Sequence, residues 1–198
     1  MQIPRLLPKK LGGSERFWIE GRTTDWRVQE FWQWSTSDLV SNATRGRLAE
    51  FIVAKAMGIS TDTVRDEWAA YDLTTPEGIK IEVKSAAYLQ SWAQNKPSSI
   101  TFRVRPARAW DPETNRQAPE PCRTADVYVF ALLAHQDKIS VDPLNLDQWE
   151  FYVLSTRAIN ERKRSQHSIT LNSLRRLHSG PVSFGKLRTA VLRTFDSG

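Results

Sequence analysis

The sequence predicts an α/β protein in which helices pack around a sheet of short strands. The chain has 198 residues, of which 40% are hydrophobic and 25% charged, a profile typical of one domain, or one domain with a small appendage. Residues 38–57 have a helical pattern, and residues 79–85 and 100–105 alternate apolar with polar side chains as half-buried strands do. The apolar run DVYVFALLA at 126–134 is typical of a strand buried on both faces.

Residues 1–37 are expected to form an N-terminal arm and a peripheral helix. The first 24 residues contain prolines, a glycine pair and scattered charge, which favours an irregular arm. Residues 25–34 have helical spacing, and four of the eight tryptophans lie between Trp18 and Trp34. Such tryptophans either stack on nucleic-acid bases or fasten a helix to the core, and we expect the second.

Residues 38–155 are expected to form the core, beginning with the helix over 38–57. Serines before this helix are suitable N-caps, and Gly58 is a suitable stop. Between the strands, residues 106–125 contain four prolines, which predicts a long irregular loop. The strands are expected at residues 67–73, 79–85, 100–105, 126–134 and 149–154.

The C-terminal segment, residues 156–198, is predicted to be helical and basic, with helices at 156–163, 171–178 and 183–195. The net charge of the chain is +6, but residues 155–198 hold nine basic and two acidic residues, so residues 1–154 sum to −1. This segment either faces the phosphates of a nucleic acid or is a solvated surface. The expected nucleic-acid contacts in it are Arg175, Arg176, Lys186 and Arg188.

The remaining composition excludes several classes of protein. The longest apolar run has eight residues, far below the ~20 that cross a bilayer, and the N-terminus lacks the apolar stretch of a secretion signal. Cys122 is the single cysteine, which excludes an intramolecular disulfide and a cysteine zinc cage. The sequence therefore predicts a cytoplasmic protein with no membrane partner.

Two carboxylates and a lysine are predicted to converge in a hairpin over residues 72–84. The sequence TPEG at 75–78 favours a type I turn with glycine at the left-handed position of a bulged three-residue loop. That loop sets a register in which Asp72 faces Glu82. Since side chains alternate along a strand, Lys84 shares the same face.

This constellation predicts a site for a small, hard cation. Opposed residues of an antiparallel pair lie ~5 Å apart, so Asp72 and Glu82 can ligate one ion. Oxygen ligands of this kind suit Mg²⁺, or Mn²⁺ as a substitute, rather than zinc. The ion would activate a water for phosphodiester hydrolysis while Lys84 stabilises the transition state. Glu50, on the preceding helix, is expected to complete the metal site.

The order of Glu50, Asp72, Glu82 and Lys84 along helix, strand, turn and strand resembles the PD-(D/E)XK nuclease superfamily. The resemblance covers residues 38–105, with strands of 126–154 added, although Tyr71 stands where the family name has proline. It implies a restriction-endonuclease-like fold, a mixed central sheet flanked by helices. It also implies a Mg²⁺-dependent DNA endonuclease of restriction, defence or DNA-processing type, with RNA left open as a substrate and a homodimer expected.

Further side chains are candidates for binding nucleic acid. Arg103 and Arg105 form a basic strip that either follows a DNA backbone or is a solvated strand edge. The other candidates lie near the hairpin, on the preceding helix and after the second strand, and are Arg45, Arg47 and Gln90.

Other functions remain open from the sequence. The same fold can be retained for nucleic-acid binding without cleavage, or the aromatic N-terminal region can dock a partner protein. A second acidic-x-Lys triplet, Glu161 to Lys163, has no opposed aspartate and is interpreted as surface charge. Metal-dependent DNA cleavage at the hairpin is the function that the sequence favours.

Overall fold

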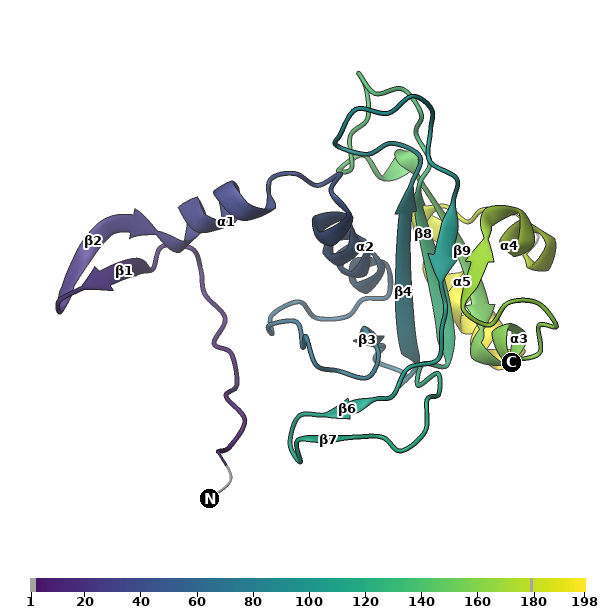
Figure 1. Ribbon diagram of the computed structural model, residues 1–198, viewed down its shortest axis with the longest axis horizontal. Helices are drawn as coiled ribbons and strands as arrows, with labels where there is room; N and C mark the ends of the chain where they lie inside the picture. The colour runs from purple at the N-terminus through teal and green to yellow at the C-terminus, as the bar shows by residue number, and fades with distance from the viewer. Residues whose placement is uncertain (1–2, 179) are drawn as a thin grey trace.

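The centre of the computed structural model, which describes residues 3–178 and 180–198, is a four-stranded mixed sheet (Figure 1). Its strand order is β3 (Leu73–Thr74), β4 (Lys80–Ala87), β8 (Val127–Leu133) and β9 (Trp149–Ser155). Strands β4 and β8 are parallel, and the two outer pairs are antiparallel. The predicted α/β class is therefore confirmed.

Both faces of the sheet are covered, and β8 is buried throughout, as its apolar run predicts. Val129 and Ala131 pack in one hydrophobic cluster with α2 (Asn42–Ala56) and α5 (Phe184–Asp196). Tyr128 and Phe130 point into a second cluster on the opposite face. That cluster includes side chains of β5 (Thr101–Arg103), α3 (Thr156–Asn160), β10 (Ser168–Thr170) and α4 (Leu171–Leu177).

Helix α2 begins four residues later than predicted. The carboxylate of Asp38 accepts hydrogen bonds from the backbone N–H groups of Val40 and Ser41 at 3.1 and 3.0 Å, which holds these residues in a turn. The helix is followed by Gly58 with φ 69°, a left-handed stop of the predicted kind.

Several predicted strand boundaries are wrong. The strand expected at 67–73 is reduced to β3, because the backbone N–H of Trp68 bonds to the Asp66 carboxylate at 3.0 Å in a local turn. The loop expected at 106–125 contains a small hairpin of β6 (Trp110–Asp111) and β7 (Arg116–Gln117). Strand β10, which pairs with β5, was expected to be part of a helical segment.

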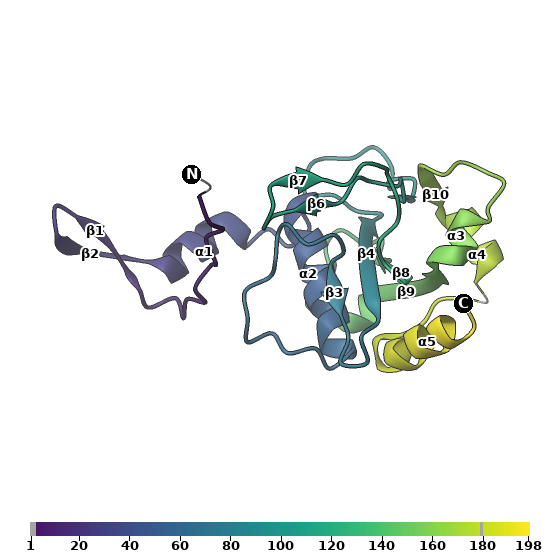
Figure 2. The same ribbon diagram turned by 90° about the horizontal axis from the view of Figure 1, so that it is seen from below.

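The N-terminal region extends away from the body of the molecule (Figures 1 and 2). It contains a hairpin of β1 (Arg16–Ile19) and β2 (Arg22–Arg27), followed by α1 (Val28–Thr36). No residue of α1 is buried, and Trp34 is 85% exposed, so the expectation that tryptophans fasten this helix to the core is wrong. The aromatic packing here is local instead, since Trp32 lies against Gly13.

The ends of the chain complete the molecule. The segment that precedes β1 lies against the body, where Arg5 forms an ion pair with Asp66 at 2.7 Å. A short 3-10 helix, η1 (Leu146–Gln148), leads into β9. Within the described residues, no helix has the length and apolarity that crossing a membrane requires.

Candidate functional site

The hairpin of β3 and β4 has the register that the sequence predicts. Leu73 pairs with Ile81 and Thr74 with Lys80, which brings Asp72 level with Glu82. The turn is closed by a hydrogen bond from the N–H of Gly78 to the carbonyl of residue 75 at 2.9 Å. The φ of Gly78 is 87°, a conformation that favours glycine.

Asp72 lies at the sheet edge and interacts with the strand that carries the other candidate residues. One of its carboxylate oxygens, Oδ2, accepts a hydrogen bond from the backbone N–H of Val83 at 2.7 Å. Burial, and then the charges of Glu82 and Glu50, raise the pKa of Asp72 to about 7. Glu82 and Glu50 are therefore each close enough to Asp72 to repel its negative charge.

Glu82 and Lys84 form an ion pair on β4, with 19% and 29% of their side chains exposed. In the parallel ladder Glu82 lies beside Tyr128, whose pKa is raised to about 12 by burial and by the charge of Glu82. The phenol therefore stays neutral near neutral pH. This arrangement leaves a carboxylate and an ammonium group together at the margin of the second hydrophobic cluster.

Arg65 joins the carboxylates, a role that the sequence pattern does not indicate. Its guanidinium bonds both oxygens of Glu50, one at 3.0 Å, and lies 2.6 Å from Glu67 Oε2 and 3.8 Å from Asp72 Oδ1. The hydrogen bonds that Arg65 donates to Glu50 are the main cause that raises the pKa of Arg65. The sequence around it, Arg-Asp-Glu in a loop, has no periodicity that separates it from ordinary surface charge.

The carboxylates have the chemistry that a divalent cation requires. Asp72 and Glu82 offer oxygen ligands, and their mutual repulsion, which contributes to the raised pKa of Asp72, is what a cation would relieve. Within the described residues no three His, Cys, Asp or Glu side chains are placed together to hold a metal ion, and Glu50 is engaged by Arg65. The oxygen atoms of Asp72 and Glu82 are donors of the kind that such a cation prefers, whereas Glu50 is held by Arg65 in this structure.

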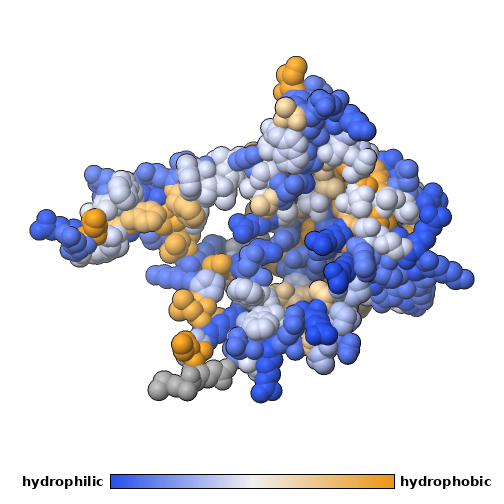
Figure 3. All heavy atoms as spheres, in the orientation of Figure 1, coloured by the Kyte–Doolittle hydropathy of each residue, from blue (hydrophilic) through white to orange (hydrophobic). Residues whose placement is uncertain are grey.

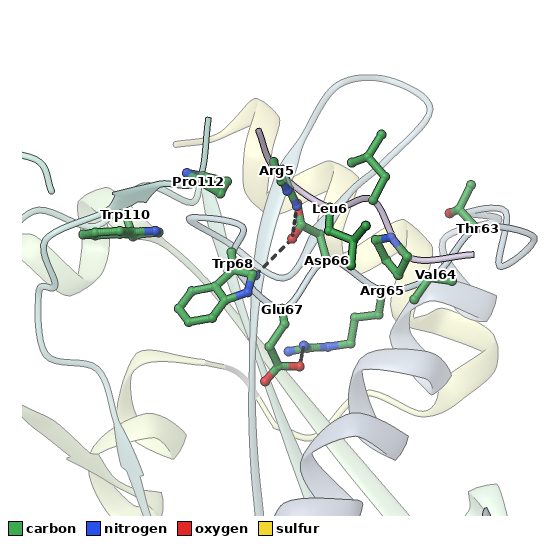
Figure 4. Close-up of a pocket in the computed structure, with 12 residues that line it drawn as sticks. Arg5, Leu6, Thr63, Val64, Arg65, Asp66, Glu67, Trp68, Trp110 and Pro112 are labelled. Atoms are coloured by element: carbon green, nitrogen blue, oxygen red, sulfur yellow. Dashed lines mark hydrogen bonds and ion pairs between the residues drawn. The ribbon is translucent and has the colours of Figure 1, made fainter. Parts of the chain in front are cut away.

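Two cavities meet at Arg65. One, of about 480 Å³, is lined by Glu50 and Asp72, with Arg47 at its margin. The other, of about 880 Å³, lies between residues 5–8, the loop at 63–68 and β6. Figure 4 shows the indole rings of Trp68 and Trp110 in this second cavity, with Arg65 directed toward Glu67. The N-terminal segment thus forms part of the wall of the space next to the candidate site.

Two predicted nucleic-acid contacts are interior residues, and these predictions are wrong. Arg45 is 3% exposed and donates hydrogen bonds to the Val40 carbonyl and Asn42 Oδ1, both at 2.7 Å. Gln90 is 7% exposed and donates to the Ala87 carbonyl at 3.1 Å, which organises the loop after β4. Both side chains support the backbone near the site because their polar groups are directed inward.

The other predicted contacts differ in availability. Arg188 donates to the Met57 carbonyl and pairs with Glu77, and Arg175 pairs with Glu150 at 3.4 Å, so both already have protein partners. The remaining side chains are exposed. Arg47, which is also exposed, lies 4.0 Å from Glu67. These available cations are Arg47, Arg103, Arg105, Arg176 and Lys186.

Comparison with known proteins identifies the family. No curated protein matches the chain. The family described as bacteriophage T4 endonuclease IV matches residues 3–173, which include the arm, the hairpin, Arg65 and all four strands of the central sheet. By this match over most of its length, the chain belongs to the bacteriophage T4 endonuclease IV family, a family of nucleases.

Proposed function

We propose that this protein is a Mg²⁺-dependent DNA endonuclease of the PD-(D/E)XK type. The observation that carries the proposal is the convergence of Asp72, Glu82 and Lys84 on one hairpin, in the register that sets the carboxylates against each other. Membership of an endonuclease family supports a nucleic acid as the substrate. The exposed arginines near β5 supply positive charge for its backbone.

Each side chain has a distinct part in the proposed reaction. Asp72 and Glu82 would hold the cation, with Mn²⁺ able to substitute, and Glu50 would join them when Arg65 moves away. When bound, the cation lowers the pKa of a water and polarises a phosphoryl oxygen. Lys84 would stabilise the negative charge that grows on the phosphoryl oxygens.

Hydrolysis forms one bond from the water oxygen to phosphorus and breaks one phosphorus–oxygen ester bond. The water loses a proton and the leaving oxygen gains one. The Val83 N–H holds one Asp72 oxygen, which leaves the other oxygen, Oδ1, directed toward the Arg65 side of the site. Asp72 is therefore oriented by the strand that carries its two partners.

The test is cleavage of supercoiled and linear DNA in Mg²⁺ and in chelator. We expect Glu82→Gln and Asp72→Asn to lower the cleavage rate at least about 10²-fold. Glu161→Gln is the matched control, because it makes the same change in the other Glu-x-Lys triplet, on an exposed residue. Equal rates for wild type and Glu82→Gln, or full activity in chelator, overturn the proposal.

A binding measurement separates cleavage from a silent binding module. Mn²⁺ titrated into wild type should give heat by calorimetry that Glu82→Gln abolishes and Glu161→Gln retains. DNA binding that ignores Mg²⁺, together with an absence of cleavage, would instead support the module without catalysis. The homodimer belongs to the same proposal, and light scattering measures it directly.

A further inference from the structure

A further cavity, separate from the two at Arg65, lies away from the hairpin, between the loop after α3 and helix α4. Its volume is about 280 Å³. Four cationic side chains line it, with one hydroxyl and one apolar side chain: Arg162, Lys163, Arg164, Arg176, Ser173 and Leu177. No acidic side chain is among the described residues that line it, so its positive charge is not neutralised locally.

Arg162 carries the strongest indication that an anion belongs here. Its Nη1 atom is buried from solvent and has no hydrogen-bond partner within the part of the chain that the structure describes. Burial, and then the charges of Arg123 and Arg164, lower the pKa of Arg162. A guanidinium nitrogen removed from water without an acceptor is unfavourable, and because Arg162 lines the cavity, a small shift of its side chain toward an anion there would relieve this cost.

The neighbouring charges do not supply the missing acceptor. Arg123 is itself a cation with donors only, and its guanidinium donates to the Val104 and Gln166 carbonyls at 2.9 and 2.8 Å. Glu161, next to Arg162 in the chain, has its carboxylate 4.0 Å from Arg157. The loop itself is fixed, since the Gln166 amide donates to the Arg162 carbonyl at 2.8 Å.

The position of this cavity points to the backbone of the substrate. Strand β5 lies against β4, β10 pairs with β5, and α4 packs beside β10, so these elements form a continuous path from the hairpin. Exposed Arg103 and Arg105 lie along it, and Arg103 pairs with Ser168 of β10. The surface over α3 and α4, at the right of Figure 3, is mainly hydrophilic.

We propose that the cavity formed by Arg162, Lys163, Arg164 and Arg176 binds a backbone phosphate of DNA, away from the bond that is cut. The planar guanidinium forks match the oxygens of a phosphodiester, and the Ser173 hydroxyl adds a neutral donor. The proposal rests on DNA being the substrate, as proposed above. It assigns this cavity to holding the nucleic acid rather than to cleavage.

Fluorescence anisotropy with labelled DNA, in chelator so that no strand is cut, tests the cavity. The double variant Arg162→Met and Arg176→Met should raise the dissociation constant about tenfold at low salt. When the logarithm of the dissociation constant is plotted against the logarithm of the salt concentration, the slope should be smaller than that of wild type by about one, as for one lost phosphate contact. Arg193→Met is the control, because Arg193 is exposed on α5, outside this cavity and the candidate site.

A second probe is independent of DNA and of cleavage. Inorganic phosphate should raise the melting temperature of wild type and of Arg193→Met, but not that of the double variant. Circular dichroism checks the fold; if the double variant is unfolded, the single variant Arg176→Met, at an exposed position, replaces it in both measurements. Phosphate binding at the cavity without any effect on DNA affinity would overturn the assignment to DNA.

The outcomes distinguish this inference from the proposed function. If the double variant has the DNA affinity and the salt slope of wild type, the proposed role of the cavity in binding DNA is overturned, whatever the cleavage assay gives. Cavity-dependent DNA binding in a wild-type protein that never cleaves supports the cavity and overturns the nuclease mechanism. Weaker binding in the double variant, with cleavage restored at saturating protein, supports both.

Discussion

The carboxylate of Asp72 accepts a hydrogen bond from the backbone N–H of Val83, the residue between Glu82 and Lys84, at 2.7 Å. This contact replaces a strand hydrogen bond at the sheet edge, beyond the short ladder of β3. It fixes the aspartate next to the other two side chains through a backbone donor of the strand that carries them. Asparagine keeps an oxygen acceptor, so Asp72→Asn removes the charge while it preserves this contact.

Asp72 makes the metal-free protein less stable as the pH rises. Its folded pKa of about 7 exceeds the usual value of 3.8, so between these values the folded chain holds a proton that the unfolded chain has lost. The free energy of unfolding should therefore fall between about pH 4 and pH 7 by an amount on the order of 4 kcal/mol from this group. Urea unfolding in chelator across this range measures it.

The Asp72→Asn variant should lack the fall in the free energy of unfolding that the titration of Asp72 causes. We expect the variant to be more stable than wild type at pH 8 and to differ little at pH 4, while it loses cleavage. Other titrating groups are common to both proteins, so their difference isolates Asp72. A constant difference across the range would show that the carboxyl titrates normally.

The affinity for metal should depend on the deprotonation of the Asp72 carboxyl. Ligands bind metal when deprotonated, so the apparent affinity for Mn²⁺ should increase by up to about tenfold per pH unit below pH 7 and level off above it. Calorimetry between pH 5.5 and 8.5 measures this. An affinity that does not change with pH would exclude Asp72 as a ligand.

Arg65→Met should destabilise the metal-free protein by about 1 to 3 kcal/mol, because Glu50 loses its hydrogen-bonded partner. The same variant should gain more stability from saturating Mn²⁺ than wild type does, since the metal no longer competes with the guanidinium. Thermal unfolding with and without Mn²⁺ tests both effects. Arg193→Met is the control, and an equal gain in all three proteins would contradict the competition.

Arg45 and Arg47 lie two positions apart on α2 and should behave differently. Arg45→Met leaves the carbonyl and amide acceptors of a buried guanidinium unpaired and should cost about 3 to 5 kcal/mol. Arg47→Met removes an exposed charge and should stay within about 0.5 kcal/mol of wild type. Denaturant unfolding compares the two, and a similar loss in both would contradict the inward role of Arg45.

The tryptophans of the N-terminal region that extends from the body, which includes α1, should contribute little to the stability of the body. Trp34→Ala removes a side chain that is 85% exposed and should change the free energy of unfolding by less than about 0.5 kcal/mol. Trp149→Ala removes a buried indole whose N–H bonds to the Pro143 carbonyl at 3.0 Å, and should cost about 3 to 5 kcal/mol. A large loss in Trp34→Ala would mean that the arm supports the core.

Local rules made the hairpin and the buried strand predictable. The turn at 75–78 sets the β3–β4 register by its length and its glycine, and an apolar run such as β8 needs both faces covered. The hairpin holds all the candidate catalytic side chains except Glu50. For that reason the register of Asp72 and Glu82 follows from residues that are close together in the chain.

The remainder depends on contacts between residues that are distant in sequence. Arg65 and Arg45 have the same charge, and only the packing of the chain separates a cation among carboxylates from one that supports backbone carbonyls. Strand β10 has three residues and exists because β5 is beside it. The arm shows the converse, since amphipathic spacing in α1 does not ensure that a partner surface is present.

The parallel pairing of β4 with β8 also determines when the site can form during synthesis. The hairpin that holds Asp72, Glu82 and Lys84 is local. The edge of β4 that faces away from β3, however, has no partner strand until residues 127–133 have left the ribosome. A two-stranded hairpin alone is marginal in water, and pairing across a long connection is slow. The nascent chain therefore carries its reactive side chains well before it can hold them in place.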